Sequence, residues 1–106
     1  MEYYCSMSYS PEDILATGAT LREWRRGARL QQADLGTLIG VDQTTVSLLE
    51  LGKRRPSIHI IGAWARACGQ DASTVAPRLA QMAGFDAEEI RRLTERLTEA
   101  PEQVAA

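Results

Sequence analysis

The sequence predicts an all-α protein on the strength of three observations. Apolar residues recur at the three- and four-residue spacing of helices through most of the chain, glycines follow several of these segments, and no segment alternates apolar and polar residues as a half-buried strand would. A length of 106 residues allows one domain with one appended element. The apolar fraction of 44% is enough for a small core.

A short helix that ends at Gly40 is the first element of the most informative segment. Leu35, Leu38 and Ile39 share its apolar face. Gly36 lies beside that face. Because a glycine inside a helix costs up to about 1 kcal/mol relative to alanine, we expect another helix axis to approach it closely. Gly40 is expected to adopt the left-handed conformation that commonly ends a helix.

A second short helix is predicted from Gln43 to Leu51. Asp42 suits its N-cap position, and Val46 and Leu49 can point inward together. Short polar groups able to hydrogen-bond base edges lie near its start, off the apolar side: Gln43, Thr44 and Ser47.

A basic loop follows this second helix. Gly52 can end the helix, Lys53, Arg54 and Arg55 come next, and Pro56 prevents any continuation. The loop would either contact phosphate or remain a solvated run of charge.

Positive charge is concentrated around these two helices. Residues 20–69 contain eight basic and four acidic side chains, a net charge of +4, whereas residues 1–19 and 70–106 each carry −3. Attraction to a phosphate backbone requires such a concentration, although the whole chain has a net charge of −2. The acidic flanks should weaken non-specific binding to DNA.

One helix is expected before this pair and three after it. The first starts at Ser10 and either breaks near Gly18 or runs on, and Thr20 with Glu23 offers a second capping box. The later helices are expected in this order along the chain: residues 58–68, residues 73–82, and a last helix that is capped by Asp86 and ends before Pro101.

The segment from Gly18 to Gly69 resembles the phage-repressor helix-turn-helix family, the Cro/cI-like or XRE-type domains of bacterial regulators. The alternative is an unrelated helical bundle whose glycines match by chance. The resemblance implies a five-helix repressor-like helix-turn-helix domain, here with an additional C-terminal helix. The matching residues occur in the family's order and spacing: Arg25, Gln32, Leu35, Gly40, Val41, Thr45, Val46, Glu50, Gly52, Lys53, Pro56, Ser57 and Ala65.

The resemblance also implies roles for individual residues. The candidates for base contacts are Gln43, Thr44, Ser47 and Leu48. The candidates for phosphate contacts are Gln32, Thr45, Lys53, Arg54 and Arg55. A structural salt bridge between Arg25 and Glu50 would fix the orientation of the second helix.

Four positions depart from the family's pattern: Leu48, Asp42, Leu51, which replaces a frequent polar residue, and Gln70, which replaces a common apolar one. Leu48 stands where a polar base-reading residue is common, and it could touch a thymine methyl group or pack on a partner protein. Asp42 places a negative charge near the expected phosphates.

The chain divides into three predicted regions. Residues 1–17 form an N-terminal arm and short helix, residues 18–69 form the DNA-binding domain, and residues 70–106 form a helical extension. The extension either covers the monomer's own core or provides a dimer interface, for which the candidates are Phe85, Ile90, Leu93 and Leu97.

Composition gives no sign of a membrane span, a secretory signal or a metal site. The two cysteines are far apart in sequence, and neither belongs to a Cys/His cluster. Trp24 and Trp64 occupy apolar helical stripes, so we expect them in the core. A cytoplasmic protein without cofactors is therefore expected.

The sequence favours a dimeric, sequence-specific DNA-binding transcriptional regulator, and a repressor over an activator, because occluding a promoter requires only binding. The partners would be double-stranded DNA and a second copy of the chain. The alternative is an antitoxin or adaptor that uses the same scaffold to bind a protein partner. An enzyme is disfavoured because no nucleophile–base set and no phosphate-cradling glycine loop is present.

Overall fold

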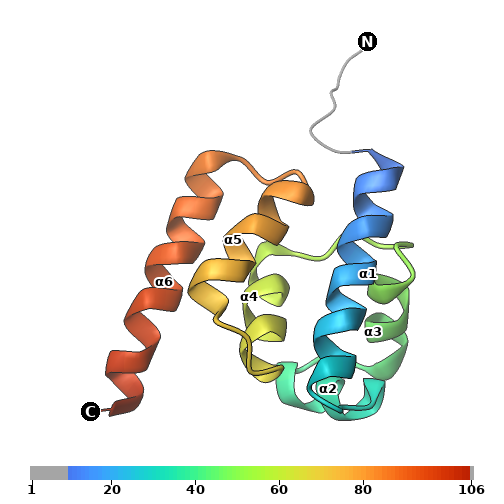
Figure 1. Ribbon diagram of the computed structural model, residues 1–106, viewed down its shortest axis with the longest axis horizontal. Helices are drawn as coiled ribbons and strands as arrows, with labels where there is room; N and C mark the ends of the chain where they lie inside the picture. Colours follow the sequence, from blue (N-terminus) through green and yellow to red (C-terminus); the bar gives the residue numbers. More distant parts are fainter. Residues whose placement is uncertain (1–9, 106) are drawn as a thin grey trace.

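The computed structural model describes residues 10–105, with side chains as far as Thr98. These residues form six helices and no strand: α1 (Pro11–Gly27), α2 (Gln32–Ile39), α3 (Gln43–Glu50), α4 (Ile58–Ala67), α5 (Ala72–Met82) and α6 (Ala87–Ala105). α4 lies in the middle, with α1, α2 and α3 on one side and α5 and α6 on the other (Figure 1). The predicted all-α class is confirmed. The expected arm of residues 1–9 lies outside the described residues.

α1 begins at a capping box and runs without a break. Asp13 N donates to Ser10 Oγ at 3.1 Å, and Ser10 N donates to Asp13 Oδ2 at 3.1 Å. The helix continues through Gly18, so the predicted division after residue 17 falls inside one element. The second capping box, expected between Thr20 and Glu23, is wrong. The Thr20 hydroxyl donates instead to the carbonyl four residues earlier, at 3.0 Å.

Gly18 allows α1 to lie directly against the end of α3. A Cβ atom at this position would lie 2.5 Å from Leu49 O and 2.6 Å from Glu50 O. No side chain fits between the two backbones. The cost of a glycine in the middle of a helix is therefore offset by close packing of α1 on α3.

The core gathers around Trp64, which is fully buried on α4. Its indole Nε1 donates to Leu21 O on α1 at 2.9 Å, so this large side chain has a partner for its one polar group. Trp24 is also buried, and the expectation that both tryptophans pack in the core is confirmed. Cys68 lies in the same cluster, and burial raises the pKa of its thiol to about 11.

The apolar stripe of α6 faces the monomer's own core. Leu93 and Leu97 are 3% and 6% exposed and cover Gly62 of α4, where a Cβ atom would lie 3.1 Å from Leu93 Cδ1. Because these two leucines are buried within one chain, their assignment to a dimer interface is wrong. Phe85 and Ile90 are partly buried against the same core.

α6 extends further than the sequence predicts. It was expected to end before Pro101 but continues to Ala105. A proline has no N–H group, so Pro101 leaves the carbonyl of Leu97 without its helical donor. Arg66 Nη2 of α4 donates to that oxygen at 3.1 Å, which satisfies the acceptor and ties α6 to α4.

Replacing Gly18 by alanine should destabilise the fold by about 1–3 kcal/mol, because the new methyl group would meet two backbone carbonyls that cannot move aside independently. Gly27 provides the matched control on the same helix, since nothing lies within 4 Å of a Cβ atom there. G27A should leave stability unchanged or raise it by up to about 1 kcal/mol. Urea unfolding of both variants measures the difference. Equal stabilities would contradict the close α1–α3 contact.

Candidate nucleic-acid interface

The turn between α2 and α3 is built around two glycines. Gly40 has a φ of 81°, the left-handed conformation expected of it. Gly40 N and Val41 N both donate to Gly36 O, at 2.8 and 2.9 Å. A Cβ atom on Gly36 would lie 2.5 Å from Val41 O. Gly36 is therefore needed for the approach of the turn's own backbone, and the expectation of another helix axis at this point is wrong.

The C-terminal end of α3 is held by the buried carboxylate of Glu50. Arg25 of α1 donates to it through two nitrogens, Nε to Oε2 at 2.5 Å and Nη2 to Oε1 at 3.0 Å. The two side chains are 12% and 2% exposed. The hydrogen bond to Glu50 raises the pKa of Arg25, against the opposing effect of burial. The expected salt bridge is thus present, with the bidentate geometry that fixes orientation as well as charge.

Two further bonds reach this ion pair, one from the loop before α2 and one from α2 itself. Arg25 Nη1 donates to Leu30 O at 2.7 Å, and Gln32 Nε2 donates to Glu50 Oε1 at 3.0 Å. Gln32 was expected at a phosphate. Its amide nitrogen carries a second proton, which remains for an acceptor outside the protein. Helices α1, α2 and α3 therefore meet at one carboxylate.

The first turn of α3 points its side chains outward. Gln43 and Thr44 are exposed, and the others of the predicted set are partly exposed: Thr45, Ser47 and Leu48. Asp42 caps this turn by accepting from Thr45 N at 2.8 Å. Hydrogen bonds from the side chain and backbone of Thr45, together with the positive charge of Arg54, lower the pKa of Asp42. The acid that departs from the family's pattern is therefore stabilised in its charged form as a helix cap.

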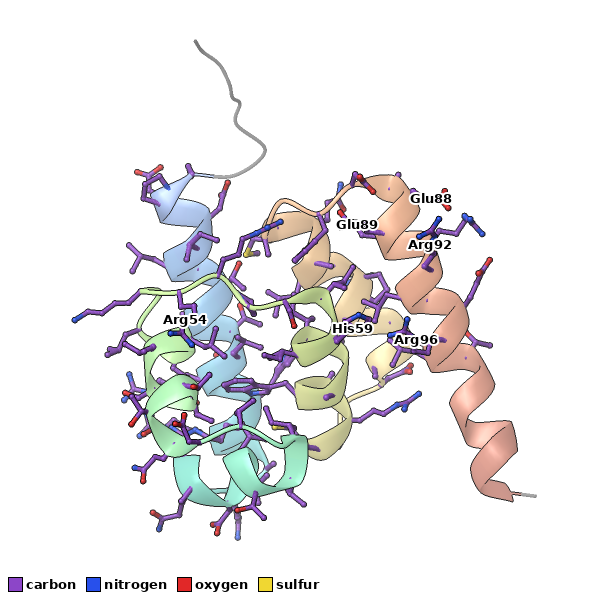
Figure 2. The ribbon with its side chains drawn as sticks, turned by 180° about the vertical axis from the view of Figure 1, so that it is seen from behind. Arg54, His59, Glu88, Glu89, Arg92 and Arg96 are labelled. Carbon is purple, nitrogen blue, oxygen red and sulfur yellow. The ribbon has the colours of Figure 1, made fainter. Side chains whose placement is uncertain are left out.

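The basic loop divides into two outward cations and one inward cation. Lys53 and Arg54 are exposed, and Figure 2 shows Arg54 at the α3 side of the molecule. Arg55 turns the other way. Its Nε donates to Ala83 O at 2.7 Å and its guanidinium lies 3.9 Å from the centre of the Phe85 ring. Arg55 thereby ties the loop to the turn between α5 and α6.

A second group of cations lies on the opposite flank of α3. Arg26 and Arg29 line a surface hollow together with Gln32 and Gln43, at the point where the end of α1 meets the starts of α2 and α3. These two arginines were not among the predicted phosphate contacts. Arg22 and Arg26 are four residues apart on α1, a spacing that could have indicated a basic face there, whereas Arg29 lies beyond the end of α1 with a φ of 62°.

The family model of the helix-turn-helix domain matches residues 16–93. The chain belongs to this helix-turn-helix domain family. The match takes in the two-helix unit α2–α3, the central helix α4 and the first turns of α6. We found no match to the chain among curated proteins or among solved structures.

The described part of this helix-turn-helix protein contains neither a metal-binding cluster nor a membrane-spanning helix. No group of three or more His, Cys, Asp or Glu side chains within it lies close enough together to hold a metal ion. None of its helices has both the length and the hydropathy to cross a membrane.

A double-mutant cycle on Arg25 and Glu50 should reveal strong coupling. R25A leaves a carboxylate that is 2% exposed without its cation and should cost about 3–5 kcal/mol of unfolding free energy. E50A should cost less, because Arg25 is nearer to water. The double variant should be more stable than the sum of the single effects implies.

R26A, on the exposed face of the same helix, is the control and should change stability by no more than about 0.5 kcal/mol. Chemical denaturation of all four variants gives the cycle. Additive effects of R25A and E50A would mean that the two side chains do not act together.

Proposed function

We propose that the protein is a sequence-specific DNA-binding transcriptional regulator. The observation that carries the proposal is the α2–α3 unit, in which the outward polar turn of α3 is fixed from behind by Arg25, Gln32 and Glu50. A rigid helix with exposed hydrogen-bonding groups at its start is what readout of the major groove requires. The base-contacting residues are Gln43, Thr44, Ser47 and Leu48.

Phosphate contacts would come from both flanks of α3. Lys53 and Arg54 supply them on one side. Arg26 and Arg29 supply them on the other, beside the free amide proton of Gln32. Contacts to both strands would hold α3 in the groove. Thr45 lies between the flanks and is a further phosphate contact.

The regulator would act as a dimer on a palindromic operator and would repress by occluding a promoter. One recognition helix reads only a few base pairs, so proteins that use this motif bind two half-sites about 34–36 Å apart. With Leu93 and Leu97 in the monomer core, the dimer surface must lie elsewhere on the chain. Such a role would place the protein in the cytoplasm with the DNA.

Selection of bound fragments from a random DNA library tests the proposed function. An enriched inverted repeat would support a dimeric, sequence-specific regulator and would supply the operator. Enrichment of a single half-site would support sequence readout and contradict the dimer. No enrichment at moderate salt would contradict the proposal and favour the adaptor.

Gln43→Ala should weaken binding to the selected site by about 1–3 kcal/mol and relax the preference at one base pair. Gln81→Ala on α5 removes the same amide from an exposed position away from α3 and should bind like the wild type. Fluorescence anisotropy with the selected site measures the loss of affinity, and the same measurement with each single-base variant of the site measures the base preference. If Q43A weakens binding to specific and random DNA equally, Gln43 does not read a base.

Arginine variants should separate phosphate contacts from other cations. R54A, R26A and R29A should each lower the slope of log K against log salt by about one unit. R55A should leave the slope unchanged, because its guanidinium already packs on Phe85 and its Nε donates to Ala83 O. The exposed Arg78 of α5 is the matched control for net charge. If R26A, R29A and R54A each give the same salt slope as R78A, none of these three arginines contacts a DNA phosphate.

A further inference from the structure

A small cavity separates the first turn of α4 from α6. Its volume is about 200 Å³, and its walls are formed by Ile58, His59, Glu89, Arg92, Leu93 and Arg96. Figure 2 shows the labelled side chains of His59 and Arg96 close together between these two helices. α6 lies at the opposite end of the molecule from α3, so the cavity is separate from the proposed DNA surface (Figure 1).

The polar wall of the cavity is dominated by hydrogen-bond donors. Arg96 Nη1 lies 2.5 Å from His59 Nδ1, and since a guanidinium can only donate, Nδ1 is the acceptor. That contact leaves Nε2 as the ring nitrogen of His59 that can donate to a ligand. Among the side chains that the structure describes, no carboxylate forms an ion pair with Arg96, so its charge is not neutralised there.

Arg92 and Glu89 are the other charged residues of the wall, and together they do not cancel the positive charge of Arg96. Arg92 donates through Nε to Glu88 Oε2 at 3.2 Å, which leaves its terminal nitrogens for another acceptor. Glu89 is the acid of the wall. Its Oε1 accepts from Asp86 N at 3.1 Å, which holds this carboxylate at the start of α6. The start of α4 adds the positive end of a helix dipole.

The floor of the cavity is apolar. Leu93 is 3% exposed and Ile58 is partly buried against the core. A ligand that reached this floor would bury its own apolar surface while its head group met the cations. Pockets for small molecules combine these two features, an apolar lining and a few convergent polar groups.

We propose that this cavity binds a small amphiphilic anion, with a carboxylate or phosphate head group against Arg96, Arg92 and His59 and an apolar body against Ile58 and Leu93. Arg96 provides charge-assisted hydrogen bonds, which are the strongest that the wall can offer. His59 Nε2 adds a further donor. The cavity has room for an apolar body of about six carbon atoms.

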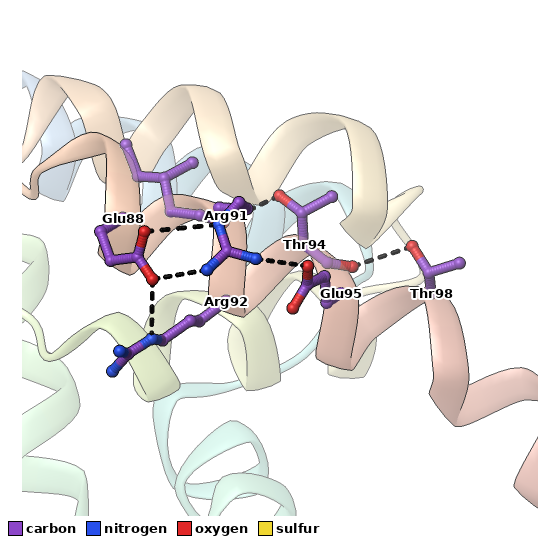
Figure 3. A network of polar contacts seen from close by, with 7 residues as sticks. Glu88, Arg91, Arg92, Thr94, Glu95 and Thr98 are labelled. Atoms are coloured by element: carbon purple, nitrogen blue, oxygen red, sulfur yellow. Dashed lines mark hydrogen bonds and ion pairs between the residues drawn. The ribbon is translucent and has the colours of Figure 1, made fainter.

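The outer face of α6 supplies a matched control residue. Arg91 lies five residues before Arg96 on α6 but belongs to a surface network, shown in Figure 3, in which it bonds to Glu88 Oε2 at 2.5 Å and Glu95 Oε2 at 2.6 Å. These bonds raise the pKa of Arg91 and lower that of Glu88. Arg91 does not line the cavity, yet R91Q and R96Q change the net charge of the protein equally.

Titration of the protein, without DNA, with benzoate, benzyl alcohol and inorganic phosphate tests the proposal, with amide and imidazole NMR signals as the readout. Benzoate should shift the signals of Ile58, His59 and Leu93 at millimolar concentration, and neutral benzyl alcohol should not. R96Q should weaken benzoate binding about tenfold, as expected for the loss of a charged hydrogen bond, and R91Q should leave it unchanged.

Each result of the titration either supports the anion site or overturns it. Stronger binding of benzoate than of inorganic phosphate would support a site for an anion with an apolar body, and binding of phosphate at least as tight as that of benzoate would overturn the apolar part of the proposal. Equal binding of benzoate and benzyl alcohol would overturn the anion site, as would equal losses from R96Q and R91Q. So would the absence of localised shifts with all three probes. None of these readouts depends on DNA binding, so the test is independent of the proposed function.

Discussion

The position of α3 depends on one carboxylate. Glu50 is almost fully buried, and a buried charge is tolerated only when it is paired and hydrogen-bonded. Arg25 from α1 and Gln32 from α2 supply three of the bonds that it needs. Because these donors come from two different helices, the carboxylate is satisfied only when α1, α2 and α3 are correctly arranged. Removing either partner would therefore leave a charge unpaired and also disturb the arrangement of the three helices.

Backbone packing reinforces the same geometry. Gly18 brings α1 onto the last carbonyls of α3, and Gly36 brings the turn before α3 onto α2, so each end of α3 is fixed by a contact that admits no side chain. Contacts with α1 and α4 hold the two-helix unit α2–α3 against the rest of the molecule. Arg55 joins the loop after α3 to the α5–α6 turn, and Arg66 joins α4 to the middle of α6.

Features with a local cause were predictable from the sequence, and features decided by long-range packing were not. The caps at Ser10, Asp42 and Gly40 were predictable because they depend on residues a few positions apart. The Arg25–Glu50 pair came from the family's spacing. Gly18 is needed because the α3 backbone packs against it, and Leu93 and Leu97 are buried because α4 packs against them. Periodicity predicts an apolar face, but it cannot tell whether a partner subunit or the chain's own core covers that face. The same holds for Arg55, which looks like its neighbour Arg54 in sequence but has Phe85 beneath it.

The affinity of R25K for the selected operator, measured beside R78K on α5, tests the central claim most directly. Both substitutions keep the charge, but lysine cannot reproduce the two-nitrogen contact of Arg25 with Glu50. If that contact fixes α3 for readout, R25K should lose about tenfold in specific affinity at a temperature where it remains folded, while R78K binds within about twofold of the wild type. An R25K variant that binds the operator as tightly as the wild type would show that charge alone suffices and would contradict the account.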